Sequence, residues 1–250
     1  MIGPLIYARV KQLVRSGKRA QAVKLAQRWR KVARGSQSAC WFEYWARVQY
    51  HFVPPGEHLD LLREARRLAR AEVNTATTWL VRELTRLYAV NGEAAIRTEI
   101  EGIVREAEEF YGESPWATSM WGELALIEGR TEEAREIQER VWASTPERFQ
   151  LEVLQQRGLV EVDSGDREEG IRLLEASRGS RTDPWTYLWL AALWEPQDPG
   201  RAKQHLDRAR ELWQGPTGTF EENQIAARHR VNHGPFWFRD KSLHPKRTGL

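Results

Sequence analysis

The sequence predicts an all-α protein built from stacked helical hairpins. Apolar residues recur at helical spacing through most of the 250-residue chain, and the alternation typical of strands is nearly absent. Three glycines at expected turns, Gly92, Gly129 and Gly165, lie 37 and 36 residues apart. Self-similarity with a period of this length indicates a helical array in which each hairpin packs against its neighbours.

Clusters of Gly, Pro, Asn, Asp and Ser divide the chain into segments of helical length, which pair into six hairpins. The expected helices span residues 4–15, 18–34, 38–52, 57–72, 75–90, 93–111, 115–128, 131–144, 147–163, 167–178, 183–194 and 199–213.

The C-terminal part departs from this array. The sequence QGPTGT after Trp213 interrupts the pattern, and residues 220–234 can then form one more helix that ends at the Gly234–Pro235 signal. We expect this helix to cover the apolar face that the last hairpin otherwise exposes. Residues 235–250 mix aromatic and basic residues with two prolines and are expected to be extended. The chain divides into a repeat domain (1–214), a capping helix (215–234) and a tail (235–250).

Small residues recur on both sides of the turn glycines. Glycine stands seven residues before two of the turns, at Gly122 and Gly158, and alanine stands five residues after two of them, at Ala22 and Ala134. Two antiparallel helices at short distance cannot accept a large side chain where their axes are nearest. We therefore expect these positions to admit the partner helix of each hairpin.

The arrangement around Gly129 resembles the tetratricopeptide repeat. That pattern has a small residue on the first helix, a turn glycine, an alanine on the second helix and a closing proline, which Gly122, Gly129, Ala134 and Pro146 match. The resemblance covers roughly residues 4–214. It implies a right-handed α-solenoid of about six antiparallel hairpins with a concave groove.

Other repeats keep only part of the pattern. Gly17 and Gly165 supply the turn glycine, whereas Gly170 and Arg97 stand where the second-helix alanine is expected. Both a true tetratricopeptide array and a looser relative are compatible with these departures.

The resemblance also implies a partner-binding groove, formed one turn apart on the first helix of each hairpin. The residues at these positions are Tyr7, Lys11, Trp79, Arg82, Arg86, Trp116, Ser119, Glu123, Gln155 and Tyr187. A mixed aromatic and arginine surface suits an extended peptide or a helix from a partner. Alternatively, Trp79 and Trp116 only join neighbouring repeats.

Charge is distributed unevenly along the chain. Residues 1–42 contain ten Lys or Arg and no acidic residue, although the whole chain carries a net charge of only +3. The expected basic surface of this N-terminal hairpin comprises Arg9, Arg15, Lys18, Arg19, Lys24, Arg28, Arg30, Lys31 and Arg34. The expected docking residues of the tail are Phe236, Trp237, Phe238, Arg239, Lys241, Lys246 and Arg247.

Basic ends around an acidic middle imply an anionic partner, or contact between copies or between the two ends of one molecule. RNA phosphates and anionic lipid are alternatives to an acidic protein surface. Base-stacking aromatics are sparse in the N-terminal hairpin, with only Tyr7 and Trp29. An organelle transit peptide also has this composition, but Gly17 and Ala22 carry the repeat pattern through the segment and favour a folded hairpin.

The sequence offers no catalytic constellation. His229 and His233 stand four residues apart on an expected helix, but no third metal ligand accompanies them. Cys40 is the only cysteine, lies among aromatic residues and is expected to be a buried, inert thiol. A phosphate-binding glycine loop is also missing from the sequence. We expect neither enzyme activity, nor a cofactor, nor a small-molecule substrate.

The leading hypothesis is an adaptor, scaffold or assembly factor that holds a protein segment in its groove and uses its basic ends to contact a larger, acidic assembly. Alternatives are an RNA- or ribosome-associated factor and a peripheral membrane protein. The sequence has neither a long apolar run nor a secretory signal pattern, so we expect a cytoplasmic protein or one in an equivalent soluble organelle compartment.

Overall fold

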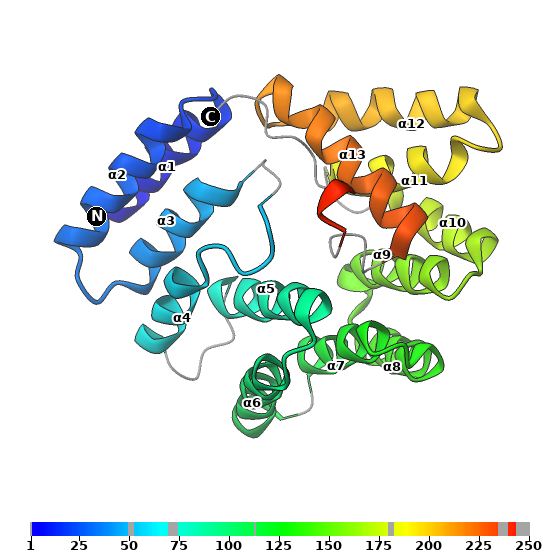
Figure 1. Ribbon diagram of the computed structural model, residues 1–250, viewed down its shortest axis with the longest axis horizontal. Coiled ribbons are helices and arrows are strands. Elements are labelled where there is room, and N and C mark those ends of the chain that lie inside the picture. The colour runs from blue at the N-terminus through cyan, green and yellow to red at the C-terminus, as the bar shows by residue number, and fades with distance from the viewer. Residues whose placement is uncertain are drawn as a thin grey trace.

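The protein is a curved array of antiparallel helical hairpins (Figure 1). The computed structural model describes residues 2–49, 53–69, 75–112, 114–179, 183–234 and 240–243. The hairpins pair α1 (Ile2–Arg15) with α2 (Arg19–Val32), α3 (Gln37–Val48) with α4 (Leu59–Leu68), α5 (Thr75–Asn91) with α6 (Ala94–Tyr111), α7 (Pro115–Ile127) with α8 (Thr131–Ser144), α9 (Glu147–Asp163) with α10 (Arg167–Ala176), and α11 (Pro184–Trp194) with α12 (Pro199–Leu212). The other elements are the helix α13 (Thr217–His233) and two 3₁₀ turns, η1 (Ser177–Gly179) and η3 (Lys241–Leu243).

This architecture confirms the predicted all-α solenoid and most of the expected helices. The largest differences are in α3 and α4, which are shorter than the expected ranges 38–52 and 57–72. The chain leaves α3 at Gln49, which is extended. Val53 is then buried, and its carbonyl oxygen accepts a hydrogen bond from Arg86 Nη2 at 3.1 Å. The connection therefore packs against α5 instead of continuing the helix.

The predicted turn glycines lie between the two helices of four hairpins. Gly129 has a φ of 78°, a left-handed conformation that side chains other than glycine rarely adopt. The next residue, Arg130, donates its backbone N–H to the carbonyl of Ala125 at 2.9 Å, which caps the end of α7. Gly17, Gly92 and Gly165 also have positive φ. The glycine period of the sequence is therefore the period of the hairpin turns.

The closest approach of two helices is between α9 and α10. A Cβ placed on Gly158 would lie 2.8 Å from Leu174 Cγ and 3.1 Å from the carbonyl oxygen of Gly170. A Cβ placed on Gly170 would lie 2.9 Å from the carbonyl oxygen of Gly158. Two glycines thus face each other across this hairpin. Gly170 replaces the alanine expected from the repeat pattern because the two backbones leave no space for a methyl group.

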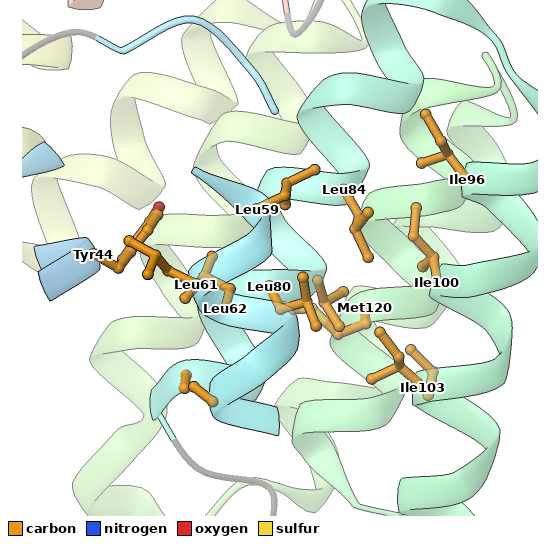
Figure 2. Packing of buried hydrophobic residues seen from close by; sticks show 14 of the residues in the cluster. Tyr44, Leu59, Leu61, Leu62, Leu80, Leu84, Ile96, Ile100, Ile103 and Met120 are labelled. Carbon is orange, nitrogen blue, oxygen red and sulfur yellow. The ribbon is translucent and has the colours of Figure 1, made fainter. Parts of the chain in front are cut away.

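The largest cluster of buried apolar residues joins α3 through α7 (Figure 2). Residues labelled there are Tyr44, Leu59, Leu61, Leu62, Leu80, Leu84, Ile96, Ile100, Ile103 and Met120. Cys40 belongs to the same cluster, and burial raises the pKa of its thiol, as expected for an inert cysteine. Separate smaller clusters lie under the first hairpin and along the later hairpins. Each hairpin is therefore stabilised mainly by its neighbours.

The array curves until its two ends meet. Arg15 at the end of α1 donates a hydrogen bond to Gln214, which follows α12. Pro216 lies beside the first turn, with its Cβ 4.0 Å from the position of a Cβ on Gly17. These contacts join the first hairpin to the residues that follow α12.

Helix α13 lies inside the curve (Figure 1). It covers the last hairpin through Phe220 and Ala227, as expected for a capping helix. It also reaches across the array, where Ala226 packs with Ala89 of α5. At its end, Arg230 Nη2 donates to Asp163 Oδ2 of α9 at 2.6 Å. The helix therefore occupies part of the concave side of the solenoid.

None of the described helices is both long enough and apolar enough to cross a membrane.

Substitution of Gly170 by alanine should lower the free energy of unfolding by about 1–3 kcal/mol, because the added methyl group forces α9 and α10 apart. Chemical denaturation of the purified protein measures this change. Gly102→Ala is the matched control, since a Cβ there meets no neighbour within 4 Å and alanine favours the helix. Equal effects of the two substitutions would show that the α9–α10 contact is not sterically limited.

Candidate functional site

The concave side of the array encloses a hollow of about 790 Å³. Its walls come from the first helices α3, α5, α7, α9 and α11, from the end of α12 and from α13. A volume of this size is typical of ligand and peptide sites in proteins. The hollow is the candidate functional site.

Aromatic side chains form much of the wall. Tyr44, Trp79, Trp185, Trp189 and Trp213 line the hollow. The rings of Tyr44 and Trp79 lie 6.2 Å apart between centroids, and those of Trp185 and Trp189 also lie 6.2 Å apart. Such residues supply a large contact area with few rotatable bonds, so they bind at a low cost in conformational entropy.

Two of the three arginines in the hollow are held by acidic partners. Arg86 Nη1 lies 2.6 Å from Glu83 Oε1, and Arg230 pairs with Asp163 through both nitrogens of its guanidinium fork. Arg82 forms no hydrogen bond or ion pair with any other residue in the described ranges. Its charge therefore remains available to the hollow.

Glu123 of α7 carries its carboxyl group into the same space. Burial raises the pKa of this carboxyl group, and the positive charges of Arg82 and Arg230 only partly oppose the shift. Neither arginine is close enough to Glu123 to form an ion pair, and no hydrogen bond to its carboxyl group is found within the described part of the chain. The carboxyl group is thus half-buried and partly desolvated, without a direct partner among the described residues.

Gln138 reaches the hollow from an outer helix. It belongs to α8, yet it lines the hollow and is only 3% exposed. The side chain passes the position where α7 has Gly122, because a Cβ there would lie 3.2 Å from Gln138 Nε2. Its Oε1 atom is buried without a hydrogen-bond partner among the described residues. Gly122 therefore opens a passage for a polar group as well as admitting the partner helix.

Gln155 connects two walls of the hollow. Its Nε2 atom donates to Asp183 Oδ2 at 2.7 Å and to Thr186 Oγ1 at 2.6 Å, so α9 is joined to the start of α11. Asp183 also accepts from the backbone N–H of Trp185 at 3.0 Å, as an N-cap residue. The hydrogen-bond donors to the carboxylate of Asp183 among the described residues are thus neutral groups, and this carboxylate lies at the edge of the site.

The structure brings together half of the predicted groove residues. Those that line the hollow are Trp79, Arg82, Arg86, Glu123 and Gln155. Those outside it are Tyr7, Lys11, Trp116, Ser119 and Tyr187. Tyr7 stacks on Phe42 with centroids 4.5 Å apart, and Trp116 packs against the main core. Trp116 thus fits the alternative interpretation, in which the tryptophans only join neighbouring repeats. Trp79 both packs on the core and lines the hollow.

The register of α11 explains the position of Tyr187. Its ring lies 6.2 Å from that of His205 on α12, whereas Trp185 and Trp189 face the hollow. Neither helix of this hairpin contains a turn glycine that fixes the alignment to the repeat pattern. Trp185 and Trp189 are four residues apart, so they lie on one face of α11, and this spacing in the sequence could have identified the inward face.

Tyr44, on the first helix α3, was also missed by sequence reasoning. Other missed residues come from outside the first helices, and they are Gln138, Trp213, Asn223 and Arg230. Gln138 lies on a second helix, and Asn223 and Arg230 lie on α13. Their contribution depends on how helices distant in sequence are placed, and no local pattern marks them.

The predicted basic surface lies on α1, α2 and the turns beside them. All of its side chains are exposed except Arg19, which is half-buried. Arg30 is partly used inside the protein, since its Nε atom lies 2.6 Å from Oε2 of the buried Glu43. Of the predicted tail residues, Phe236, Trp237, Phe238, Arg239, Lys246, Arg247 and the side chain of Lys241 lie outside the described residues.

The two histidines considered as metal ligands lie on α13. The rings of His229 and His233 are 5.6 Å apart between centroids. No group of three or more potential metal ligands occurs among the described residues.

Neither a protein-family model nor a curated protein matches this sequence. A solved tetratricopeptide repeat protein from Parabacteroides merdae ATCC 43184 is similar in structure, with a TM-score of 0.64 and 14% sequence identity over 90% of this chain and 85% of that one. This chain has a tetratricopeptide-like helical repeat fold. A chain of the APC/C hetero-tetramer Cut9–Hcn1 is similar with a TM-score of 0.49 and 12% identity, over 90% of this tetratricopeptide-like chain and 46% of that one. At these identities the similarity concerns the fold.

Substitution of Glu123 by glutamine should raise the free energy of unfolding at pH 8 by about 1 kcal/mol, because it removes a partly desolvated charge that has no ion partner among the described residues. The folded protein holds the Glu123 proton more tightly than the unfolded chain does, since its pKa is raised. The wild type therefore gains stability as the pH falls through that pKa, and the difference in free energy of unfolding between the variant and the wild type should narrow. Chemical denaturation of both proteins at several pH values measures this difference. Glu139→Gln, at an exposed position of α8, is the control and should change little.

Proposed function

We propose that this protein is a non-enzymatic scaffold or assembly factor that holds a segment of a partner protein in its hollow. The observation that carries the proposal is the concave site itself, where aromatic walls surround polar groups that have no partner among the described residues. Residues of this kind form the energetic centre of many protein interfaces. A cofactor and a small-molecule substrate have no part in this function.

The position of α13 defines the kind of segment that fits. Because α13 packs along α11 and reaches α5 and α9, it already fills part of the concave side. A long partner helix laid along the whole groove would have to displace it. An extended segment or a loop can enter the remaining space beside α13 without breaking the Arg230–Asp163 ion pair.

A photo-crosslinking amino acid tests this function. Placed at Gln156, which lines the hollow, p-benzoylphenylalanine should crosslink to a specific protein in cells that express the full chain. The same amino acid at the exposed Glu139, on the outer helix α8, should give at most about a tenth of that product, because it faces away from the hollow. Equal crosslinking at the two positions, or none at Gln156, would contradict the proposal.

We also infer that the basic N-terminal hairpin contacts an anionic surface of the same assembly. Its exposed cations lie in a segment without acidic residues, so they repel one another unless an anionic partner is bound. Sequence-specific RNA binding is the weaker alternative, because Tyr7 and Trp29 both stack on Phe42 of α3, with ring centroids 4.5 and 5.0 Å apart. A lipid surface is the other alternative, and the highly exposed Leu5 and Val32 are the observation in its favour.

Charge reversal at Lys24, Arg28 and Lys31 separates these partners. The triple glutamate variant should lose most of the crosslinked complex, and the wild-type complex should weaken about tenfold or more between 50 and 300 mM salt. A fluorescent RNA and phosphatidylserine vesicles serve as parallel probes. The control reverses Lys203 and Arg208, which are exposed on α12. If the protein binds only the RNA or only the vesicles, the basic hairpin contacts RNA or lipid and not an acidic protein surface.

A further inference from the structure

We propose that the hollow takes a positively charged side chain, arginine or lysine, from the partner segment, an inference that rests on the proposed binding function. The site is assigned to a cation by its unused hydrogen-bond acceptors, by its surplus of negative charge and by its aromatic walls.

The hollow contains hydrogen-bond acceptors without a partner among the described residues, beside the unpaired guanidinium of Arg82. Gln138 Oε1 is buried without a partner among the described residues, and Glu123 has no hydrogen bond there. By contrast, Arg86 donates to Glu83 and to the carbonyl of Val53, and Arg230 is paired with Asp163. An unsatisfied buried acceptor costs free energy, which a ligand recovers by bringing N–H donors. Guanidinium and ammonium groups consist of such donors and contain no acceptor.

The charges in the hollow also favour a cationic ligand. Once the Arg86–Glu83 and Arg230–Asp163 pairs are set aside, the groups that face the hollow without an ion partner among the described residues are Arg82, Glu123 and Asp183. They amount to two carboxyl groups and one guanidinium when Glu123 is ionised. A cationic side chain neutralises this surplus, whereas an anionic one would add to it.

The aromatic walls of the hollow also favour a cationic side chain. Trp79, Trp185 and Trp189 line the hollow beside the polar groups, and ring faces attract cations. The chain uses this contact elsewhere, since the guanidinium carbon of Arg201 lies 4.0 Å from the centroid of the Trp194 ring. An arginine or lysine with its aliphatic stem against the rings can thus place its charged end near Glu123 and Gln138.

Three short peptides test the proposal on the full chain. They are acetyl-Ala-Arg-Ala-amide, the same peptide with neutral citrulline in place of arginine, and the same peptide with glutamate. Binding is measured at pH 8 by tryptophan fluorescence and by saturation-transfer NMR. The arginine peptide should bind at least about tenfold more tightly than the citrulline peptide, since charge-assisted hydrogen bonds are about twice as strong as neutral ones. The glutamate peptide should bind most weakly.

Two substitutions connect the binding to this site. Glu123→Gln should remove most of the preference for arginine over citrulline. Arg82→Gln should strengthen binding of the arginine peptide several-fold, because it removes a like charge from the hollow. A gain in affinity cannot arise from misfolding, so the second variant stays informative if the first is damaged. Glu139→Gln on the outer surface should leave the affinities unchanged.

Equal affinity for the arginine and citrulline peptides, tighter binding of the glutamate peptide, weaker binding after Arg82→Gln, or no binding of any peptide would overturn the assignment to a cation. If any of these occurs while the crosslink at Gln156 persists, the hollow binds a partner of other chemistry and only this inference fails. If the crosslink is also absent, the binding function itself fails.

Discussion

The structure depends on the close approach of the two helices in each hairpin. Gly158 and Gly170 show the limit of this approach, since each occupies a place where the opposite backbone excludes a methyl group. Tight pairing makes every hairpin a thin unit that cannot bury its apolar residues alone. Each unit must therefore pack against the next, and the core becomes a series of clusters along the array instead of one centre.

Curvature turns this series of hairpins into a site. The first helices lie on the inside, and contacts of Gln214 and Pro216 with the first turn bring the two ends together. Helix α13 then closes part of the interior, which leaves a hollow lined by residues from most of the chain. The small side chains that allow tight pairing also shape this hollow, because Gly122 lets an outer-helix glutamine reach its wall.

The polar groups in the hollow are best explained by binding. Protein interiors rarely leave a buried acceptor or carboxyl group without a partner, because the loss of hydration is not repaid. Gln138 Oε1 is in this situation, and the half-buried carboxyl group of Glu123 has no hydrogen bond or ion pair among the described residues, whereas ion pairs such as Arg135–Glu161 are frequent elsewhere. Groups that reduce the stability of the free protein are common at sites that act on something else. This contrast supports a binding role for the concave side.

Local patterns in the sequence determined the helices, the hairpin turns and the small residues at the helix contacts. These features depend on residues near one another in the chain, so periodicity and Gly129-type turns predict them. The groove residues were implied by the resemblance to the tetratricopeptide repeat, and half of them, Trp79, Arg82, Arg86, Glu123 and Gln155, line the hollow. The tertiary structure alone decided the closure of the ends, the position of α13 inside the curve, and the entry of Gln138 and Arg230 into the site. Each of these results from small rotations between successive hairpins, which add up over the whole array and leave no local mark in the sequence.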